Sequence, residues 1–150
     1  MKNESLTVFV ESIANFFKTH TKTEVDIGTP FLIDNINKYL SDYTGIISIS
    51  GNHKGSVFFT MPSRMAIHLL SEMGLMSTQD EKLMDLVGEV CNTVAGNARR
   101  EFGDQFILSV PIMFKGETEN IKVHDVASIY IIPVVWQGIK SHLIINLNGE

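Results

Sequence analysis

The chain has 150 residues, 44% of them hydrophobic, which is enough for one domain with its own core. Twelve Lys and Arg against seventeen Asp and Glu give a net charge of −5, which disfavours nonspecific binding to nucleic acid. No apolar run reaches the ~18 residues of a membrane span, the start lacks the layout of a signal peptide, and the single cysteine excludes an intramolecular disulfide. We therefore expect a soluble, cytoplasmic protein with one domain over residues 1–150.

The first part of the chain predicts a helix followed by three strands. Apolar residues at helical spacing over residues 4–20 predict a helix packed on the core. Residues 23–33 alternate in part between apolar and polar, which favours a strand. Two further strands are predicted at residues 43–50 and 56–61, joined by a hairpin turn over residues 51–55.

The rest of the chain predicts two more helices and three more strands. Pro62 suits the first turn of a second helix, which ends at Gly74. A longer helix follows, and after it come three β-rich runs: residues 106–114, 127–136 and 139–147. Gln137 and Gly138 join the last two runs in a turn. This order indicates an α+β fold, with an antiparallel-rich sheet and about three helices packed on one face.

The long helix is predicted over about residues 78–102, because both of its ends carry sequence signals. Capping-box pairs stand at its start: Ser77 with Asp80 and Thr78 with Glu81. Arg99 and Arg100 lie near its end, as the helix macrodipole favours, and Gly103 follows as the expected C′ residue.

One side of this helix carries a row of polar and small residues. At about 100° per residue, four of them fall within a strip roughly 60° wide: Asp85, Glu89, Asn92 and Gly96. We call these four residues the polar ridge, and Gly88 lies beside it. The opposite side is apolar: Leu83, Leu86, Val87, Val90, Val94 and Ala98. Small residues beside polar side chains let another surface come close, so the pattern predicts a functional face.

Other candidate chemistries lack the residues that they need. The five histidines show no metal-ligand spacing, and one cysteine makes a structural zinc site unexpected. No histidine lies one helical turn from Cys91, so a thiol nucleophile is not expected either. Asn97 turns toward the buried side of the helix, where it is expected to form a structural hydrogen bond.

The spacing D-x-x-x-E-x-x-N of Asp85, Glu89 and Asn92 resembles the active-site signature of the CheC/CheX/FliY phosphatases of bacterial chemotaxis. The A-G-N-A run over residues 95–98 is similar to the small-residue run that follows the asparagine of that family. E-x-x-N alone is a weak motif, because Glu and Asn three residues apart occur on many exposed helices. The assignment therefore depends on the wider match.

The resemblance extends to residues 9–17, residues 23–32 and Pro111 in a strand after the helix, so it spans most of the chain. One copy of the signature in this length resembles the CheX type, which implies a single CheX-like phosphatase domain and a homodimer. The runs 127–136 and 139–147 give a separate reason to expect a dimer, because the second has few charges to protect a sheet edge. If both runs are interior strands, their apolar character has another explanation.

The resemblance implies a phosphatase that hydrolyses the aspartyl phosphate of a CheY-like response regulator. Asn92 is neutral and cannot be a general base, so it would position the attacking water, and Glu89 would pair with a lysine of the regulator. The regulator would supply the Mg²⁺, so the chain needs no cofactor or metal of its own. Gly88 and Gly96 would allow the partner to approach. Asp85 would bind the partner or complement the N-terminal half of its helix.

Two other functions stay open from the sequence. The alternative is a noncatalytic module that binds a response regulator or the flagellar switch through the same ridge. A structural adaptor unrelated to phosphate is the third. Turnover of a phosphorylated regulator separates an enzyme from a binder.

Overall fold

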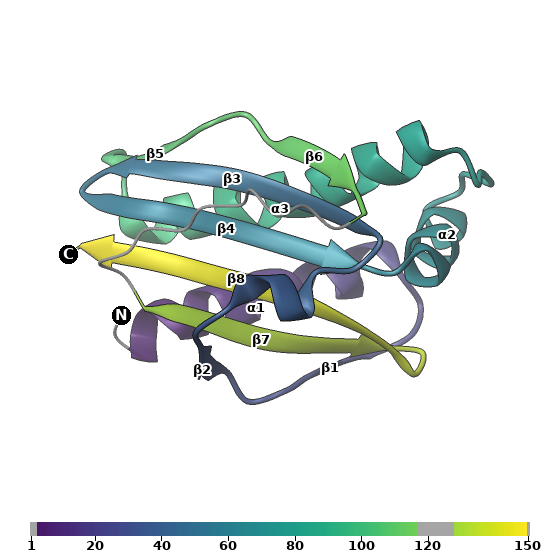
Figure 1. Ribbon diagram of the computed structural model, residues 1–150, viewed down its shortest axis with the longest axis horizontal. Helices are drawn as coiled ribbons and strands as arrows, with labels where there is room; N and C mark the ends of the chain where they lie inside the picture. Colours follow the sequence, from purple (N-terminus) through teal and green to yellow (C-terminus); the bar gives the residue numbers. More distant parts are fainter. Residues whose placement is uncertain (1–2, 117–127, 150) are drawn as a thin grey trace.

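Eight strands form one antiparallel sheet, and three α-helices cover one of its faces (Figure 1). This computed structural model describes residues 3–116 and 128–149. The strand order is β1-β7-β8-β4-β3-β5, with β2 also paired to β7 and β6 also paired to β3. The arrangement confirms the predicted α+β class. Ala127, at the start of one predicted run, and His124 lie outside the described residues.

The three helices are α1 (Asn3–His20), α2 (Ser63–Glu72) and α3 (Asp80–Phe102). Each has an apolar side that faces the sheet, as the spacing of its hydrophobic residues requires. Within the described residues, no helix is long and apolar enough to cross a membrane.

The start of α3 differs from the prediction. Gln79 is the N-cap residue and makes no capping hydrogen bond with its side chain, so the two predicted capping boxes do not form. Ser77 instead accepts a hydrogen bond from the Gln79 backbone N–H at 3.1 Å, within the preceding loop. The C-terminal end agrees with the prediction, because Gly103 follows α3 with φ 96° and donates its N–H to Arg99.

The predicted strand over residues 23–33 is divided into β1 (Val25–Ile27) and β2 (Phe31–Ile33). Both pair with β7 (Ile129–Trp136), but residues 28–30 lie opposite only two residues of β7. The extra residue makes a β-bulge. The single long strand expected from the alternation is therefore wrong at Gly28, Thr29 and Pro30, where the pairing is interrupted.

The other side of the sheet is interrupted in the same way. The predicted strand over residues 106–114 is divided into β5 (Phe106–Leu108) and β6 (Ile112–Lys115), both paired with β3. Pro111 lies in the interruption and not in a strand, because proline has no N–H to donate. Ser109 bridges the gap: its N–H donates to Ser48 O at 3.0 Å, and its hydroxyl accepts from Ser48 N–H at 2.9 Å.

The central hairpin is longer than predicted. β3 (Tyr43–Gly51) and β4 (His53–Met61) extend through most of the segment that was expected to be a five-residue turn. Ile49 pairs with Gly55, so only the tip around Asn52 turns. The predicted turn over residues 51–55 is therefore too long.

The last hairpin lies inside the sheet. β7 pairs with β8 (Ile139–Gly149), and β8 also pairs with β4. Gln137 and Gly138 both have positive φ, as the tight hairpin turn predicted here requires. The argument that these two runs present an unprotected edge is therefore wrong, since both are interior strands.

Two hydrophobic cores lie on opposite faces of the sheet. The larger one is enclosed by the three α-helices and includes Phe9, Phe17, Phe59 and Trp136. The smaller one lies between the short helix η1 (Ile36–Tyr39) and the sheet, and includes Ile36, Phe58 and Ile144. The helix that carries the polar ridge therefore has a covered side and an open side.

Candidate functional site

Asp85, Glu89 and Asn92 lie on the open side of α3, as the helical spacing predicts. All three residues are exposed, and their side chains make no hydrogen bond or ion pair within the part of the chain that the structure describes. Two carboxylates and an amide in one row, without intramolecular partners, leave their donors and acceptors available to another molecule.

Gly96 of the ridge and Gly88 beside it lie in different surroundings. A Cβ on Gly96 would meet nothing within 4 Å, so this position is open next to Asn92. A Cβ on Gly88 would lie 2.8 Å from Met113 Sδ of β6, and Gly88 is buried. Gly88 therefore faces the protein's own sheet edge, and its size serves the packing of α3 on β6. The expectation that Gly88 lets a partner approach the helix stays a prediction.

The covered side of α3 sits very close to β3. A Cβ on Gly45 would be 3.0 Å from both Cys91 Sγ and Val87 O, so only glycine at this strand position lets the helix approach so closely. Burial raises the pKa of the Cys91 thiol to about 12. A neutral, buried thiol is a core residue and not a nucleophile, in agreement with the prediction.

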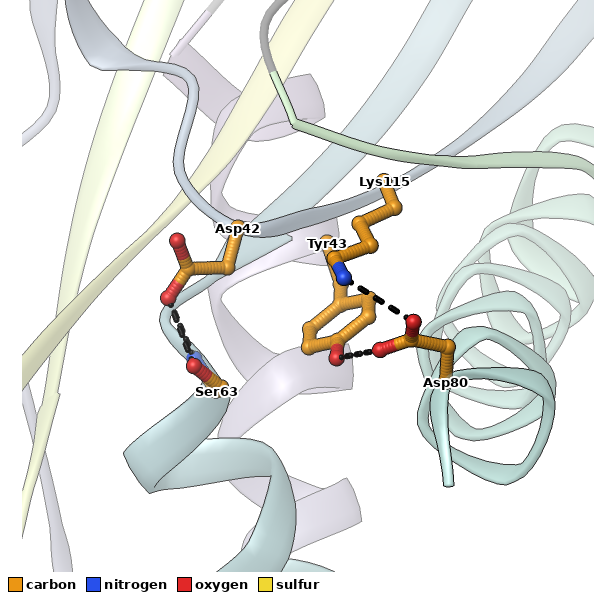
Figure 2. Close-up of polar contacts among 5 residues, drawn as sticks. All are labelled: Asp42, Tyr43, Ser63, Asp80 and Lys115. Atoms are coloured by element: carbon orange, nitrogen blue, oxygen red, sulfur yellow. Dashed lines mark hydrogen bonds and ion pairs between the residues drawn. The ribbon is translucent and has the colours of Figure 1, made fainter. Parts of the chain in front are cut away.

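A polar cluster holds the beginning of α3 against two strands (Figure 2). The Tyr43 hydroxyl of β3 donates to Asp80 Oδ1 at 2.5 Å, and Lys115 Nζ of β6 forms an ion pair with Asp80 Oδ2 at 2.9 Å. Asp80 is the first residue of α3, so these contacts fix where the helix starts relative to the sheet. The capping-box prediction assigned Asp80 to its own helix, whereas it binds β3 and β6.

A second carboxylate in Figure 2 does the same for α2. Asp42 Oδ2 accepts from both the backbone N–H and the hydroxyl of Ser63, each at 2.8 Å, so it takes the place of the side-chain cap that Pro62 cannot supply. These hydrogen bonds, first the backbone one, lower the pKa of Asp42. The hydrogen bond from Tyr43 and that from Lys115 lower the pKa of Asp80.

The end of α3 carries two arginines. Arg100 donates a hydrogen bond to Asn97 Oδ1, so Asn97 does form a hydrogen bond within the helix, but an exposed one and not on the predicted buried side. Both residues line a groove between α3 and α1 that also includes Glu11 and Asn15. The side chain of Arg99 is exposed and forms no hydrogen bond or ion pair within the described residues.

A metal cluster is absent from the ridge and from the rest of the described residues, and a sizeable cavity lies elsewhere. Among the described residues, no group of three or more His, Cys, Asp and Glu side chains could hold a metal ion. A cavity of about 770 Å³ lies beside α2 and the loop before α3, lined in part by Ile67, His68 and Met76, all of them off the ridge. The ridge is an exposed helix face, which suits a protein partner better than an enclosed small molecule.

The fold with this open helix is that of CheC-like proteins. A CheC-like superfamily protein from Shewanella sp. PV-4 superposes with a TM-score of 0.87 at 27% identity, covering 99% of this chain and 100% of that one. Chemotaxis protein CheX from Vibrio vulnificus gives a TM-score of 0.84 at 28% identity, covering 97% and 99%. CheX in the CheX–CheY–BeF3–Mg²⁺ complex from Borrelia burgdorferi shares the fold, with a TM-score of 0.79 at 18% identity over 96% of this chain and 97% of that one.

The chain belongs to the family of the chemotaxis phosphatase CheX, which matches residues 43–134. This confirms the resemblance that the signature and the wider match indicated. The matched segment includes the whole of α3 and therefore the polar ridge. No curated protein sequence matches the chain significantly.

Proposed function

We propose that this protein hydrolyses the aspartyl phosphate of a CheY-type response regulator, with Glu89 and Asn92 as its catalytic pair. The observation that carries the proposal is that both side chains are exposed, side by side on α3, and unpartnered within the described residues. The chain's membership of a chemotaxis phosphatase family supports the reaction class. The homologous fold in the Borrelia burgdorferi complex is bound to CheY with BeF3 and Mg²⁺, which supports the partner class.

Asn92 would act by position and not by proton transfer. Its amide can hold a water molecule in line with the phosphorus atom, and phosphoryl transfer depends largely on positioning and electrostatics. One oriented hydrogen-bonding group of this kind is worth roughly 10²–10³ in rate, or about 3–4 kcal/mol. That magnitude is sufficient for a phosphatase that accelerates a hydrolysis already possible without it.

Glu89 would fix the position of the partner on α3. Residues three apart on a helix have Cβ atoms about 5–6 Å from each other. A lysine of the regulator paired with Glu89 would therefore place the phosphoryl group near Asn92. The Mg²⁺ would belong to the regulator, where carboxylates hold it beside the phosphate. This chain would contribute the amide and the carboxylate alone.

The test is the lifetime of the phosphorylated regulator at substoichiometric protein. Asn92→Ala should abolish the acceleration while the thermal midpoint and the affinity for the regulator stay close to those of the wild type. Glu89→Ala should weaken both affinity and rate. Asn15→Ala is the matched control, because Asn15 is also an exposed asparagine on a helix, and it should behave as wild type.

Two results would contradict the proposal. Wild-type turnover by Asn92→Ala would exclude the water-positioning role. Stoichiometric protection of the phosphate by the wild-type protein, without turnover, would indicate the noncatalytic binding module instead.

A further inference from the structure

The two arginines at the end of α3 differ in availability. Arg100 is engaged by Asn97 and lies in the groove against α1. The side chain of Arg99, its neighbour in sequence, is exposed and forms no hydrogen bond or ion pair within the described residues. A guanidinium is always charged and presents five N–H donors, so an unpaired one on a candidate site is a ready contact for an anion.

Arg99 continues the line of the ridge beyond Asn92. Seven residues return a helix to within about 20° of the same direction, about 10 Å further along the axis. Long side chains on a helix lean in general toward its N-terminus, which for Arg99 is the direction of Asn92. Gly96 lies between them, and a Cβ added there would meet nothing within 4 Å beyond the backbone of its own helix and its chain neighbours. No ridge side chain separates the amide from the guanidinium.

Charges of opposite sign flank Asn92 on this side of α3. Asp85 and Glu89 precede it, and Arg99 follows. A phosphorylated aspartate site is anionic, because the phosphoryl oxygens and the carboxylates that hold Mg²⁺ lie together. The chain itself has a net charge of −5, so it repels such a site except where an unpaired cation meets it.

On the basis of the proposed function, we propose that Arg99 binds the anionic rim of the partner's phosphoaspartate site, while Glu89 binds the lysine of that site. The partner is thus a phosphoprotein surface that is acidic over Arg99 and basic over Glu89. These two contacts of opposite sign allow one docking direction along α3. Arg99 would then determine specificity for this surface, with the reaction itself left to Asn92.

The experiment compares Arg99→Gln, Arg99→Lys and Arg100→Gln with the wild type. Arg100→Gln is the matched control, since it removes the same charge from the same helical turn but from a residue turned toward α1. Steady-state dephosphorylation of a CheY-type regulator is measured at low and at high salt. Thermal midpoints of all variants are recorded in parallel.

Arg99→Gln should raise KM about threefold to tenfold and leave kcat within about twofold, as expected for one charged contact at a partly desolvated interface. Its KM should also depend less on salt, because one attractive contact is lost. Arg99→Lys should recover most of the affinity, and Arg100→Gln should match the wild type. Unchanged KM in Arg99→Gln, or an equal rise in Arg100→Gln, would overturn the assignment.

The proposed function and this inference fail in different ways. Activity that Asn92→Ala abolishes but Arg99→Gln leaves untouched retains the phosphatase and rejects the Arg99 contact. If the wild type accelerates no hydrolysis, titration of the regulator loaded with BeF3 and Mg²⁺ still measures the contact. Weaker binding by Arg99→Gln than by Arg100→Gln then supports it, and equal binding rejects it.

Discussion

Gly88 and Gly96 show how one residue type serves opposite purposes on one helix. Glycine in the middle of a helix costs roughly 0.5–1 kcal/mol relative to alanine, so each needs a reason to be there. For Gly88 the reason is internal, since Met113 fills the space. For Gly96 the structure supplies no internal reason, because the space is empty. A partner that approaches α3 closely at Gly96 would supply one.

Alanine at the two glycines should therefore have different effects on the free energy of unfolding. Gly96→Ala should stabilise the protein by about 0.5–1 kcal/mol, because a helix interior favours alanine. Gly88→Ala should be less favourable than Gly96→Ala by about 1–3 kcal/mol, because its Cβ forces the Met113 side chain to move. Urea unfolding measures both free energies of unfolding.

Met113→Ala provides the control for the clash. In that background Gly88→Ala should lose most of its cost, because the thioether no longer occupies the space. The same loss of stability with and without Met113 would reject the packing explanation. Gly96→Ala should also lower the affinity for the regulator, which separates its role in binding from its effect on the helix.

At the scale of elements, helical periodicity predicts which side of α3 is open, and therefore where Asp85, Glu89 and Asn92 lie. Periodicity describes one helix and is insensitive to what packs on it, so the contact of Gly88 with Met113 could not be predicted. The same applies to Asp80, whose partner Tyr43 is 37 residues away in sequence. The position of Asp80 in the sequence also fits a local capping box, but its side chain binds Tyr43 and Lys115 instead.

The interruptions of the two predicted strands could be predicted in part from the sequence. Pro30 and Pro111 both lie in runs that alternate like strands, and a proline within such a run argues for a sheet edge or a bulge. The interior position of β7 and β8 could not be predicted from the sequence, because an apolar run is compatible with an edge strand and with a central one. Pairing with β4 decides between them.

The hydroxyl that holds the start of α3 should make stability depend on alkaline pH. Burial and the hydrogen bond to Asp80 raise the pKa of Tyr43 from 10.0 to about 12. Because the folded pKa is the higher one, this stabilisation is fully present below pH 10 and is lost as the pH rises toward 12. Urea unfolding of the wild type and of Tyr43→Phe between pH 8 and 12 measures it.

The difference between the two proteins isolates Tyr43. The Cys91 thiol, whose pKa is also about 12, adds an alkaline loss that both share. The wild type should lose its advantage over Tyr43→Phe within the window from pH 10 to 12. A constant difference across that window would contradict the assignment.

At the scale of the whole molecule, homodimerisation stays a prediction. It followed from the family resemblance and from an edge position of β7 and β8, and the second reason no longer holds. Light scattering at micromolar concentration decides the matter. A mass of twice the 16.8 kDa of one chain is expected, and a mass near 16.8 kDa would contradict it.

The two interruptions at the sides of the sheet have a consequence for how chains behave when crowded together. Within the described residues, β1 and β2 end the sheet on one side and β5 and β6 on the other, and each side contains a bulge with a proline. An uninterrupted edge strand would offer unpaired N–H and C=O groups to which strands of other molecules can add. The side formed by β5 and β6 also exposes Ile107, Val110 and Ile112 to solvent. The interruptions at Pro30 and Pro111 thus oppose edge-to-edge pairing of the native protein with other molecules.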